Sequence, residues 1–447
     1  MIQPITPVAI TAFTATTGCG VGRDALLNAL SERRTGLTPN DFGTEPLPTF
    51  VGRVPEIETL AFPPEFAVHD CRNNRLAWIG LQADGFLDAA KAAIARYGAE
   101  RVGLLLATST SSIGATEEAY TRLTDDKRFP EDLRRPEVHH PHSLGAFLRS
   151  VLGCTGPTLT TATACSSSAK VFAQAERLLR LGLIDAAIVG GVDTLCGAVL
   201  FGFNALELVS PEPCRPCDVE RRGINLGEAA GYALIERDGP ATAPKLLGWG
   251  ESSDAHHMST PHPEGLGARL AIEGALARAN RHVESVDYIN MHGTASQKND
   301  EVEAGLIARM FPSRTLASST KGWTGHTLGA AGIVEAVISL LALETGLVPG
   351  CLNAETLDPV CGPQVQINNQ QARVHTVLSN SFGFGGNNAA LLFGAGVPHE
   401  PESSDRRHRV LLAIRADLAR CPRRDARGIR AAGHAGRPAS ERGAGPY

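Results

Sequence analysis

Two short apolar runs constrain the fold of this chain more than any other feature of its sequence. Residues 101–107 (RVGLLLA) and residues 186–192 (AAIVGGV) contain no charged side chain after Arg101 and show no alternation of apolar with polar residues. A strand with one face in water would alternate in this way, so both runs predict strands that are buried on both faces. Such strands are typical of parallel sheets that are covered by helices.

Helical patterns lie between the predicted strands along the whole chain. A strand at residues 8–13 leads through a glycine turn into an amphipathic helix at residues 24–32, and a helix at residues 168–183 precedes the run at 186–192. The second half repeats this style, with strands expected at 286–291, 376–380 and 389–393 and helices at 301–310 and 330–345. Strands that alternate with helices predict an α/β fold.

The composition indicates a globular cytoplasmic protein. The chain has 447 residues, of which 43% are hydrophobic and 20% charged, enough for one large core or two fused halves. No basic residue precedes Arg23, so we expect no signal peptide, and no apolar run reaches the roughly 20 residues of a membrane span. Ten cysteines without a repeated spacing predict reduced thiols. The 5% aromatic content argues against a nucleic-acid surface.

The last segment of the chain differs in charge from the rest. From residue 397 onward there are eleven arginines, no lysine and six acidic residues, so this tail carries +5 while the remainder carries −10. The tail is also rich in alanine, glycine and proline. We therefore expect residues 397–447 to be poorly ordered.

Two groups of residues have side chains that could bind a metal, but core or loop positions explain both groups more simply. Cys214 and Cys217 have the spacing of a zinc half-site, but no second cysteine pair follows at a suitable distance, so a core or loop role is favoured. His139, His140 and His142 lie in the polar stretch 116–142, where a solvated loop is more common than a metal site. A metal-dependent hydrolase built on these histidines stays as a minor alternative.

The segment 156–170, GPTLTTATACSSSAK, contains the best candidate for a nucleophile. Its small residues would allow a strand to turn sharply into the following helix and present Cys165 at the first helical turn. There the positive end of the helix dipole would favour the thiolate and lower the cysteine pKa toward neutrality. A buried structural cysteine is the alternative, and cysteine statistics alone favour it.

Two histidines follow strand or glycine patterns at which side chains can project into a cleft. His292 lies in NMHGTASQKND (290–300), directly after a predicted strand, and His326 lies in SSTKGWTGHTLGAAG (318–332), five residues after Lys321. Glu335 on the next helix could return to pair with Lys321, although a solvated lysine is the simpler explanation.

A fourth segment, SNSFGFGGNN (379–388), passes from a strand into glycines, where a backbone N–H could point at a developing oxyanion.

The four segments together resemble the β-ketoacyl-acyl carrier protein synthases, in the elongating branch that uses a Cys-His-His active site. The resemblance covers roughly residues 1–395 and includes TACSSS, HGTxSxxxD, STKxxTGHxxGAAG and SFGFGG in the order of the family. It implies a thiolase-like, five-layered α/β/α/β/α fold of two similar halves. The nucleophile would lie in the half at residues 1–250, the catalytic histidines in the half at 251–396, and the Arg-rich tail at 397–447.

The resemblance also implies roles for individual residues. Cys165, His292, His326 and Lys321 would be catalytic, and Glu335 would pair with Lys321. The backbone N–H groups of Cys165 and Phe384 would form an oxyanion hole, and the Phe384 side chain would gate the acyl pocket. Asp300 would support the site. Thr294, Ser296 and Ser259 would contact the substrate arm. The family more often has threonine at the place of Ser296.

The activity implied is a decarboxylative Claisen condensation. Cys165 would carry an acyl group, and malonyl-acyl carrier protein would elongate it by two carbons, without a metal or redox cofactor. A chain-length factor, the inactive partner in related systems, would carry glutamine at the place of Cys165. Starter-unit synthases use Cys-His-Asn, and thiolases use a second cysteine near the end of the chain. A catalytically silent subunit is the alternative function.

The pathway and the partners are less constrained. The segments GINLGEAAG, CSSSAKVF and FNALELVSPEPCRPCD resemble synthases of aryl polyene pigments more than housekeeping fatty-acid enzymes, which have a bulkier residue at Asn225. The protein would then form a heterodimer with a chain-length factor, and otherwise a homodimer.

Acyl carrier proteins are acidic, so a basic patch is expected on this otherwise acidic body. Arg72, Arg75, Lys127 and Arg128 are the candidates, and ordinary solvated charges are an equally good explanation.

Overall fold

This computed structural model describes residues 2–396 of the chain. The expectation of a disordered tail at 397–447 lies outside the described residues. Within the described part, ten strands form one large mixed sheet. In spatial order they are β11 (Leu316–Ser318), β10 (Tyr288–Asn290), β14 (Thr376–Gly383), β15 (Asn387–Gly394), β9 (Lys245–Ser253), β1 (Val8–Thr17), β8 (Ala229–Glu236), β6 (Ala186–Asp193), β4 (Val102–Ala107) and β5 (Thr158–Thr161).

This sheet consists of two sets of five strands with the same topology. In the first half β5, β4 and β6 are parallel, and β8 and β1 then pair antiparallel. In the second half β11, β10 and β14 are parallel, and β15 and β9 then pair antiparallel. Within the sheet, the two sets of strands are joined only where Val8 and Ala9 of β1 pair with Leu246 and Lys245 of β9. The two similar halves expected from the sequence are therefore present.

The position of the boundary between the halves follows from this topology. The first strand of the second half, β9, begins at Lys245, so a boundary at residue 250 would cut through it. The connection between β8 and β9, at residues 237–244, is the place where the chain passes from one set of strands to the other.

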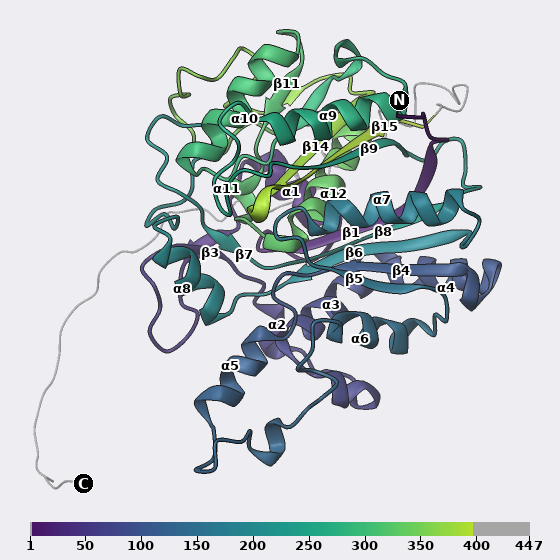
Figure 1. Cartoon of the computed structure of the whole chain (residues 1–447), viewed down its shortest axis with the longest axis vertical. Coiled ribbons are helices and arrows are strands. Elements are labelled where there is room, and N and C mark those ends of the chain that lie inside the picture. Colours follow the sequence, from purple (N-terminus) through teal and green to yellow (C-terminus); the bar gives the residue numbers. More distant parts are fainter. Residues whose placement is uncertain (1, 397–447) are drawn as a thin grey trace, which may run out of the picture. The chain divides into compact units, whose positions relative to one another are not determined.

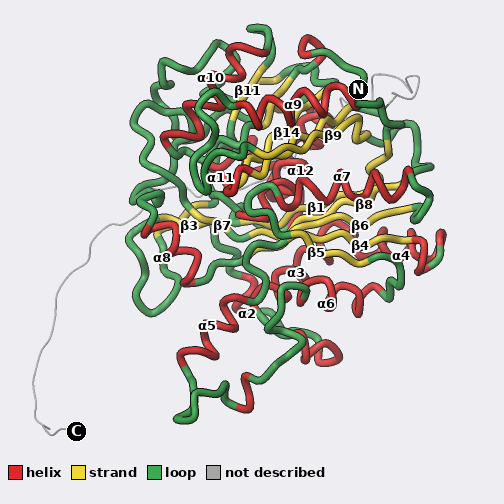
Figure 2. The backbone as a smooth tube through the Cα atoms, viewed as in Figure 1, coloured by secondary structure: helices red, strands yellow, loops and turns green. Residues whose placement is uncertain are grey.

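Helices form the remaining three layers, as Figures 1 and 2 show. Between the two sets of strands lie α7 (Ser167–Arg180) and α12 (Ala331–Thr345), with α1 (Gly22–Glu32) packed against the same core. The outer face of the first set is covered by α3 (Arg72–Gln82), α4 (Phe86–Tyr97) and α6 (Ser143–Leu152), and that of the second by α9 (Leu266–Ala279) and α10 (Gln297–Met310). The predicted five-layered α/β fold is thus confirmed.

Shorter elements complete the described part. They are α2 (Glu56–Thr59), α5 (Ile113–Thr121), α8 (Gly197–Ala205), α11 (Lys321–Thr324), β2 (Leu37–Pro39), β3 (Phe50–Gly52), β7 (Leu226–Gly227), β12 (Leu347–Val348) and β13 (Gln370–Gln371).

The apolar run of β4 shows why such strands need helices on both sides. Leu105 and Ala107 face the core that contains α7 and α12, whereas Leu104 and Leu106 face the core under α3, α4 and α6. Side chains alternate between the faces of a strand, so an unbroken apolar run fits only a sheet with two dry faces.

Helix α12 is apolar on all sides because it lies between the two sets of strands. The stretch Leu328–Thr345 is long and apolar enough by composition to cross a membrane. However, 83% of this stretch is buried inside the protein, as is typical of a core helix.

The contact between β9 and α9 gives a test of this packing. A Cβ atom on Gly250 would lie 1.8 Å from the carbonyl oxygen of Ala271, so no side chain fits there unless the helix moves. We expect Gly250→Ala to destabilise the protein by about 3 kcal/mol, measured by urea unfolding. Gly202→Ala in α8, where a Cβ atom meets nothing within 4 Å, is the control and should leave stability unchanged or raise it by up to about 1 kcal/mol. Equal unfolding midpoints for the two variants would contradict the packing.

Candidate active site

A sharp turn places Cys165 between β5 and α7. Ala164 has a φ of 52°, a left-handed conformation that is costly for a residue with a side chain, and α7 begins two residues after the cysteine, at Ser167. Hydroxyl groups hold the turn: Ser167 Oγ accepts from the Thr163 N–H at 2.8 Å, and Ser166 Oγ donates to the Thr163 carbonyl at 2.9 Å. Cys165 therefore precedes the helix rather than lying in its first turn.

The two predicted histidines converge on this cysteine from the second half. His292 follows β10, and His326 follows α11. His326 Nε2 lies 2.9 Å from Cys165 Sγ, and ligand atoms of Cys165, His292 and His326 all lie within 4.8 Å of one another. The imidazole rings are nearly perpendicular, with centroids 5.5 Å apart. All three residues are at most 5% exposed, so the structure brings the three residues that the sequence pointed to together in one buried cluster.

Lys321 and Glu335 form the ion pair that was expected, and it is buried. Lys321 Nζ donates to Glu335 Oε1 and also to the carbonyl oxygen of His292. The lysine thus fixes the backbone at His292. Burial raises the pKa of Glu335 to about 7, although the Lys321 ammonium opposes this shift.

Glu303 on α10 has a positioning role that the sequence reasoning missed. Its carboxylate accepts from the backbone N–H groups of His292 at 2.9 Å and Gly293 at 2.8 Å, and from Asn380 Nδ2 at 3.1 Å. The side chain is 1% exposed. Its spacing of three residues from Asp300 on one helix face was a usable signal, because residues at that spacing lie side by side.

Asp193, at the end of β6, is a second residue that was missed. Its Oδ1 accepts from Thr108 Oγ1 at 2.8 Å and from the backbone N–H groups of Ser109 at 2.8 Å and Thr110 at 2.7 Å, while Oδ2 accepts from the Ala330 N–H at 3.1 Å. This buried carboxylate ties the loop after β4 to the start of α12, next to the nucleophile.

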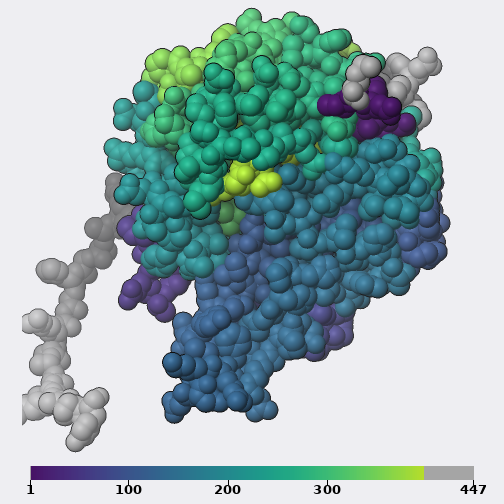
Figure 3. Space-filling view, viewed as in Figure 1, coloured from purple at the N-terminus to yellow at the C-terminus, as the bar shows by residue number. Residues whose placement is uncertain are grey.

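The two backbone N–H groups that are expected to form an oxyanion hole lie beside the Cys165 sulfur, and their role stays a prediction. The N–H groups of Phe384 and of Cys165 itself both lie within hydrogen-bonding reach of the cysteine sulfur. A Cβ atom on Gly383 would lie 3.2 Å from the Cys165 nitrogen, so glycine allows this close approach of β14. Phe384 is partly exposed and Gly385 is exposed. In Figure 3 the last described residues, coloured yellow, reach the surface between the two halves.

The residues expected to contact the substrate arm are placed unequally. Thr294 Oγ1 and Ser296 Oγ lie 2.9 Å apart beside His292, and Asp300 accepts from the Ala295 N–H at 3.2 Å and the Cys217 N–H at 2.8 Å, which fixes this turn. Ser259 lies on a separate loop, where its N–H donates to His257 Nδ1 at 3.2 Å. Among the described residues it makes no hydrogen bond to the catalytic groups.

The expectation of a lowered cysteine pKa is wrong for this closed site. Burial raises the pKa of Cys165 to about 11, and Lys321 and the nearby backbone N–H groups offset only part of this effect. Burial also lowers the pKa of His292 and of His326 well below the usual value, with Lys321 acting in the same direction. The cysteine and the histidines therefore rest as neutral groups.

The predicted docking patch is corrected in part. Arg72 Nε and Nη2 donate to Glu228, which is fully buried, at 2.7 and 2.9 Å, so its charge is balanced internally, which argues against the expected docking role. Arg75 is likewise engaged with Asp70 at 2.6 and 2.8 Å. Lys127 and Arg128 are exposed, and their docking role stays a prediction.

The histidines and cysteines considered above as alternative metal ligands do not form a metal site among the described residues. His139 bonds to Thr116 and His142 to Thr160, at 2.9 and 2.6 Å, and Cys214 donates to the Lys321 carbonyl. Within residues 2–396, Cys165, His292 and His326 are the one group of three or more such ligands whose donor atoms converge.

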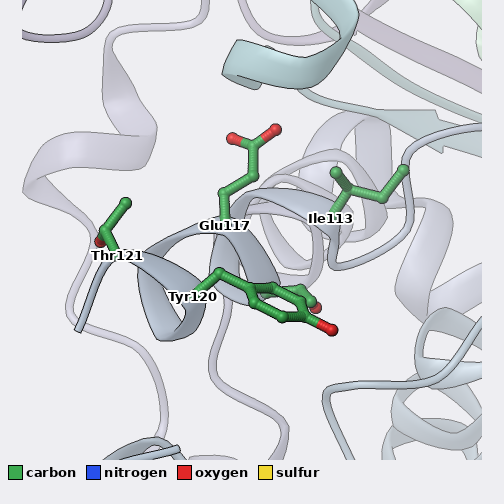
Figure 4. A pocket seen from close by; sticks show the side chains of 5 residues that line it. Ile113, Glu117, Tyr120 and Thr121 are labelled. Carbon is green, nitrogen blue, oxygen red and sulfur yellow. The ribbon is translucent and has the colours of Figure 1, made fainter. Parts of the chain in front are cut away.

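A pocket on α5 is lined by Ile113, Thr116, Glu117, Tyr120 and Thr121, none of which belongs to the catalytic cluster (Figure 4).

Comparison with known protein families agrees with this geometry. A model of the beta-ketoacyl synthase N-terminal domain matches residues 6–241, and a model of the C-terminal domain of the same family matches residues 245–355. This chain belongs to the β-ketoacyl synthase family. The gap between the two matches coincides with the connection between β8 and β9.

Individual relatives support the same assignment. Nodulation protein E of Rhizobium sp. (strain N33) is 32% identical over 84% of this chain and 96% of its own length. The mitochondrial 3-oxoacyl-[acyl-carrier-protein] synthase of Arabidopsis thaliana is 38% identical over 54% of this chain, a match that spans 57% of that protein. In a solved complex of ketosynthase ApeO with its chain length factor ApeC, from Xenorhabdus doucetiae, one chain matches with a TM-score of 0.79. That chain is 35% identical, and the match covers 87% of this chain and 98% of that one. The predicted family and enzyme class are confirmed.

The raised cysteine pKa predicts a specific pH dependence of alkylation. With a pKa of about 11, only about one Cys165 thiol in a thousand is ionised at pH 8, and the fraction grows tenfold per pH unit below the pKa. Iodoacetamide labelling of Cys165, followed by peptide mass spectrometry, should rise steadily up to about pH 10. An unstructured peptide with one cysteine, whose thiol has an ordinary pKa of about 8.5, is the reference and should level off earlier. A plateau below pH 8 would show that the thiolate is stabilised.

The contacts of Glu303 predict a loss of activity without a loss of fold. In Glu303→Gln one of the two carboxylate oxygens is replaced by an amide NH₂, which cannot accept a hydrogen bond, and the other becomes a weaker acceptor. The N–H groups of His292 and Gly293 are then held less firmly, so His292 can leave its position. We expect kcat to fall about 10²-fold in a carrier-protein condensation assay. Glu301→Gln changes an exposed acid on the same helix and should retain activity. Comparable activity of both variants would exclude the positioning role.

Proposed function

We propose that this protein is the active ketosynthase of a two-step condensation in which Cys165 carries the growing acyl chain. The observation that supports this most directly is the convergence of one thiol and two imidazoles, with His326 Nε2 2.9 Å from Cys165 Sγ, beside the backbone N–H groups of Cys165 and Phe384. A nucleophile, proton-transfer groups and an oxyanion hole are the parts that acyl transfer requires.

In the first step the acyl group moves from a carrier-protein thioester to the cysteine. The carbonyl oxygen would lie between the N–H groups of Cys165 and Phe384, and the sulfur would attack the carbonyl carbon. Because the thiol rests protonated, its proton would pass to His326 as the new bond forms and then to the departing pantetheine sulfur. A thioester on Cys165 and a free carrier-protein thiol result.

In the second step malonyl-carrier protein binds and loses carbon dioxide. The electron pair of the broken bond forms an enolate, whose oxygen would accept hydrogen bonds from His292 and His326, each worth about 3 kcal/mol. Neutral imidazoles are suited to this role because they can donate without carrying charge. The enolate carbon then attacks the Cys165 thioester, which expels the Cys165 thiolate and releases a β-ketoacyl product two carbons longer. The thiolate would take up one proton from solvent to restore the thiol.

This chemistry involves no electron transfer to a cofactor, and decarboxylation itself supplies the carbanion. We therefore propose that the substrates, attached to the phosphopantetheine arm of acyl carrier protein, are all that the reaction needs. A cytoplasmic location fits the nine free cysteines of the described residues.

We propose that the protein works with a second ketosynthase-like chain in a polyene-type pathway. The match to the complex of ApeO with its chain length factor supports this pairing. The strand β5 lies at the end of the sheet with Leu159 46% exposed, which leaves an edge on which a partner strand could pair. Because this chain retains Cys165 with both histidines, it would be the catalytic member rather than the silent subunit.

Separate substitutions should divide the two steps. Cys165→Ala removes the acyl carrier, so we expect condensation to fall at least about 10³-fold while decarboxylation of malonyl-carrier protein continues. His292→Ala removes an enolate donor and should slow decarboxylation about 10²-fold. Intact-protein mass spectrometry of enzyme and carrier proteins measures both steps. An acyl adduct on any residue other than Cys165 would contradict the proposal.

A panel of saturated acyl and polyenoyl carrier proteins tests the pathway in the same assay. Preference for polyenoyl donors supports the polyene assignment, and preference for saturated chains indicates fatty-acid synthesis.

A further inference from the structure

The catalytic cluster has a second chemical property that the condensation does not use. A cysteine sulfur and two histidine nitrogens within 4.8 Å of one another form the ligand set that zinc prefers in proteins. Three protein ligands leave one position open, as in catalytic zinc sites. No other group of three such residues converges within the described residues 2–396.

The distance between two of the ligand atoms is close to that of a tetrahedral site, and the third ligand atom lies within 4.8 Å of both. Zinc bonds of about 2.3 Å to sulfur and about 2.0 Å to nitrogen place the ligand atoms roughly 3.5 Å apart. The distance from Cys165 Sγ to His326 Nε2 is 2.9 Å, so these atoms need to separate by only about half an ångström. Rotation of the two side chains supplies a movement of this size.

The surroundings of the cluster set the strength of such a site. Nδ1 of His292 and Nδ1 of His326 are buried without a hydrogen-bond partner, so no neighbouring group stops either ring from presenting a free Nε2. Zinc ligands with such partners bind 10- to 100-fold more tightly, so the expected binding is reversible rather than structural. The positive charge of Lys321 is paired with Glu335, but it still disfavours positive charge at both histidines, which also weakens the binding of a cation.

The site is also close to the surface. Phe384, whose N–H faces the cysteine sulfur, is partly exposed, and the next residue, Gly385, is exposed. This turn therefore connects the buried cluster with the exposed surface.

We infer that Cys165, His292 and His326 bind a thiophilic divalent cation of the zinc class, and that this ion reversibly switches the enzyme off. The inhibition, unlike the binding, rests on the proposed condensing function. A bound ion occupies the sulfur lone pair and both ring nitrogens at once, so neither acyl transfer nor decarboxylation can proceed. An acyl group on Cys165 removes the thiolate ligand, so the acylated enzyme is protected from the ion.

Co²⁺ is the probe for binding, because a tetrahedral Co²⁺–thiolate centre absorbs in the near-ultraviolet and visible ranges. We expect the reduced full-length chain to bind one Co²⁺ with this spectrum. Binding should weaken at least tenfold in Cys165→Ala and in wild-type protein whose Cys165 has first been alkylated, which keeps the native sequence should the variant not fold.

Cys217→Ala is the matched control. Cys217 is buried in contact with the thiols of Cys351 and Cys361, the other place where thiols gather, and its loss should leave the Co²⁺ spectrum unchanged. A spectrum that depends on Cys217 instead, or that survives alkylation of Cys165, overturns the inference.

Zn²⁺ tests the switch. Micromolar Zn²⁺ should abolish condensation and slow iodoacetamide labelling of Cys165, and a chelator should restore both. Active enzyme that binds no Co²⁺ at Cys165 refutes the metal site and leaves the proposed function intact. Co²⁺ bound at Cys165 in a chain that never condenses refutes the proposed function and leaves the metal site intact. Condensation unaffected by Zn²⁺ bound at Cys165 refutes the switch.

Discussion

The close contact between the two central helices holds the catalytic groups together. A Cβ atom on Gly332 of α12 would lie 2.5 Å from the Ala169 nitrogen of α7, and the Ile333 N–H donates to Ser168 Oγ at 2.9 Å. Helix α7 begins just after Cys165, and α12 begins shortly after His326. A larger residue at this contact would separate the helices and, with them, the nucleophile from its base. The small residues of GAAG are therefore as necessary to the site as the residues that react.

The electrostatic cost of burying these groups explains their neutral resting state. A thiolate and an imidazolium would attract each other, but each would have to leave water, and burial favours the neutral forms of both. The charges that the interior does retain are paired, as Lys321 is with Glu335, or accept several backbone N–H groups, as Asp193 does. In the proposed reaction, charge would develop at the reacting atoms only during the reaction, and the fixed N–H groups of Cys165 and Phe384 would stabilise it by hydrogen bonding.

The parts of the structure that were predictable depend on local sequence, and those that were not depend on tertiary burial. Unbroken apolar runs identified β4 and β6 because only a strand dry on both faces tolerates them. Small residues before Cys165 predicted the turn. The spacing placed Glu303 on the same helix face as Asp300, but the sequence could not show that this face is buried, because burial depends on how α10 packs. Arg72 was misassigned for the same reason: nothing in the sequence shows that Glu228, far along the chain, neutralises it.

The repeated topology explains why the reacting groups face each other. In each half the third strand in chain order leads into the central helix: β5 is followed by Cys165 and α7, and β11 by His326 and α12. Cys165 and His326 therefore occupy corresponding places in two similar units. Because α7 and α12 pack against each other, the corresponding residues that precede them are brought into contact at 2.9 Å.

The two halves differ in the side chains at these corresponding places. The first half has the thiol of Cys165 and the second has the imidazole of His326, while His292 follows the preceding strand of the second half, β10. In the first half the loop after the matching strand, β4, holds Thr108 and Thr110, which bind Asp193. The fold thus supplies two matching positions, and the difference between the halves supplies the chemistry.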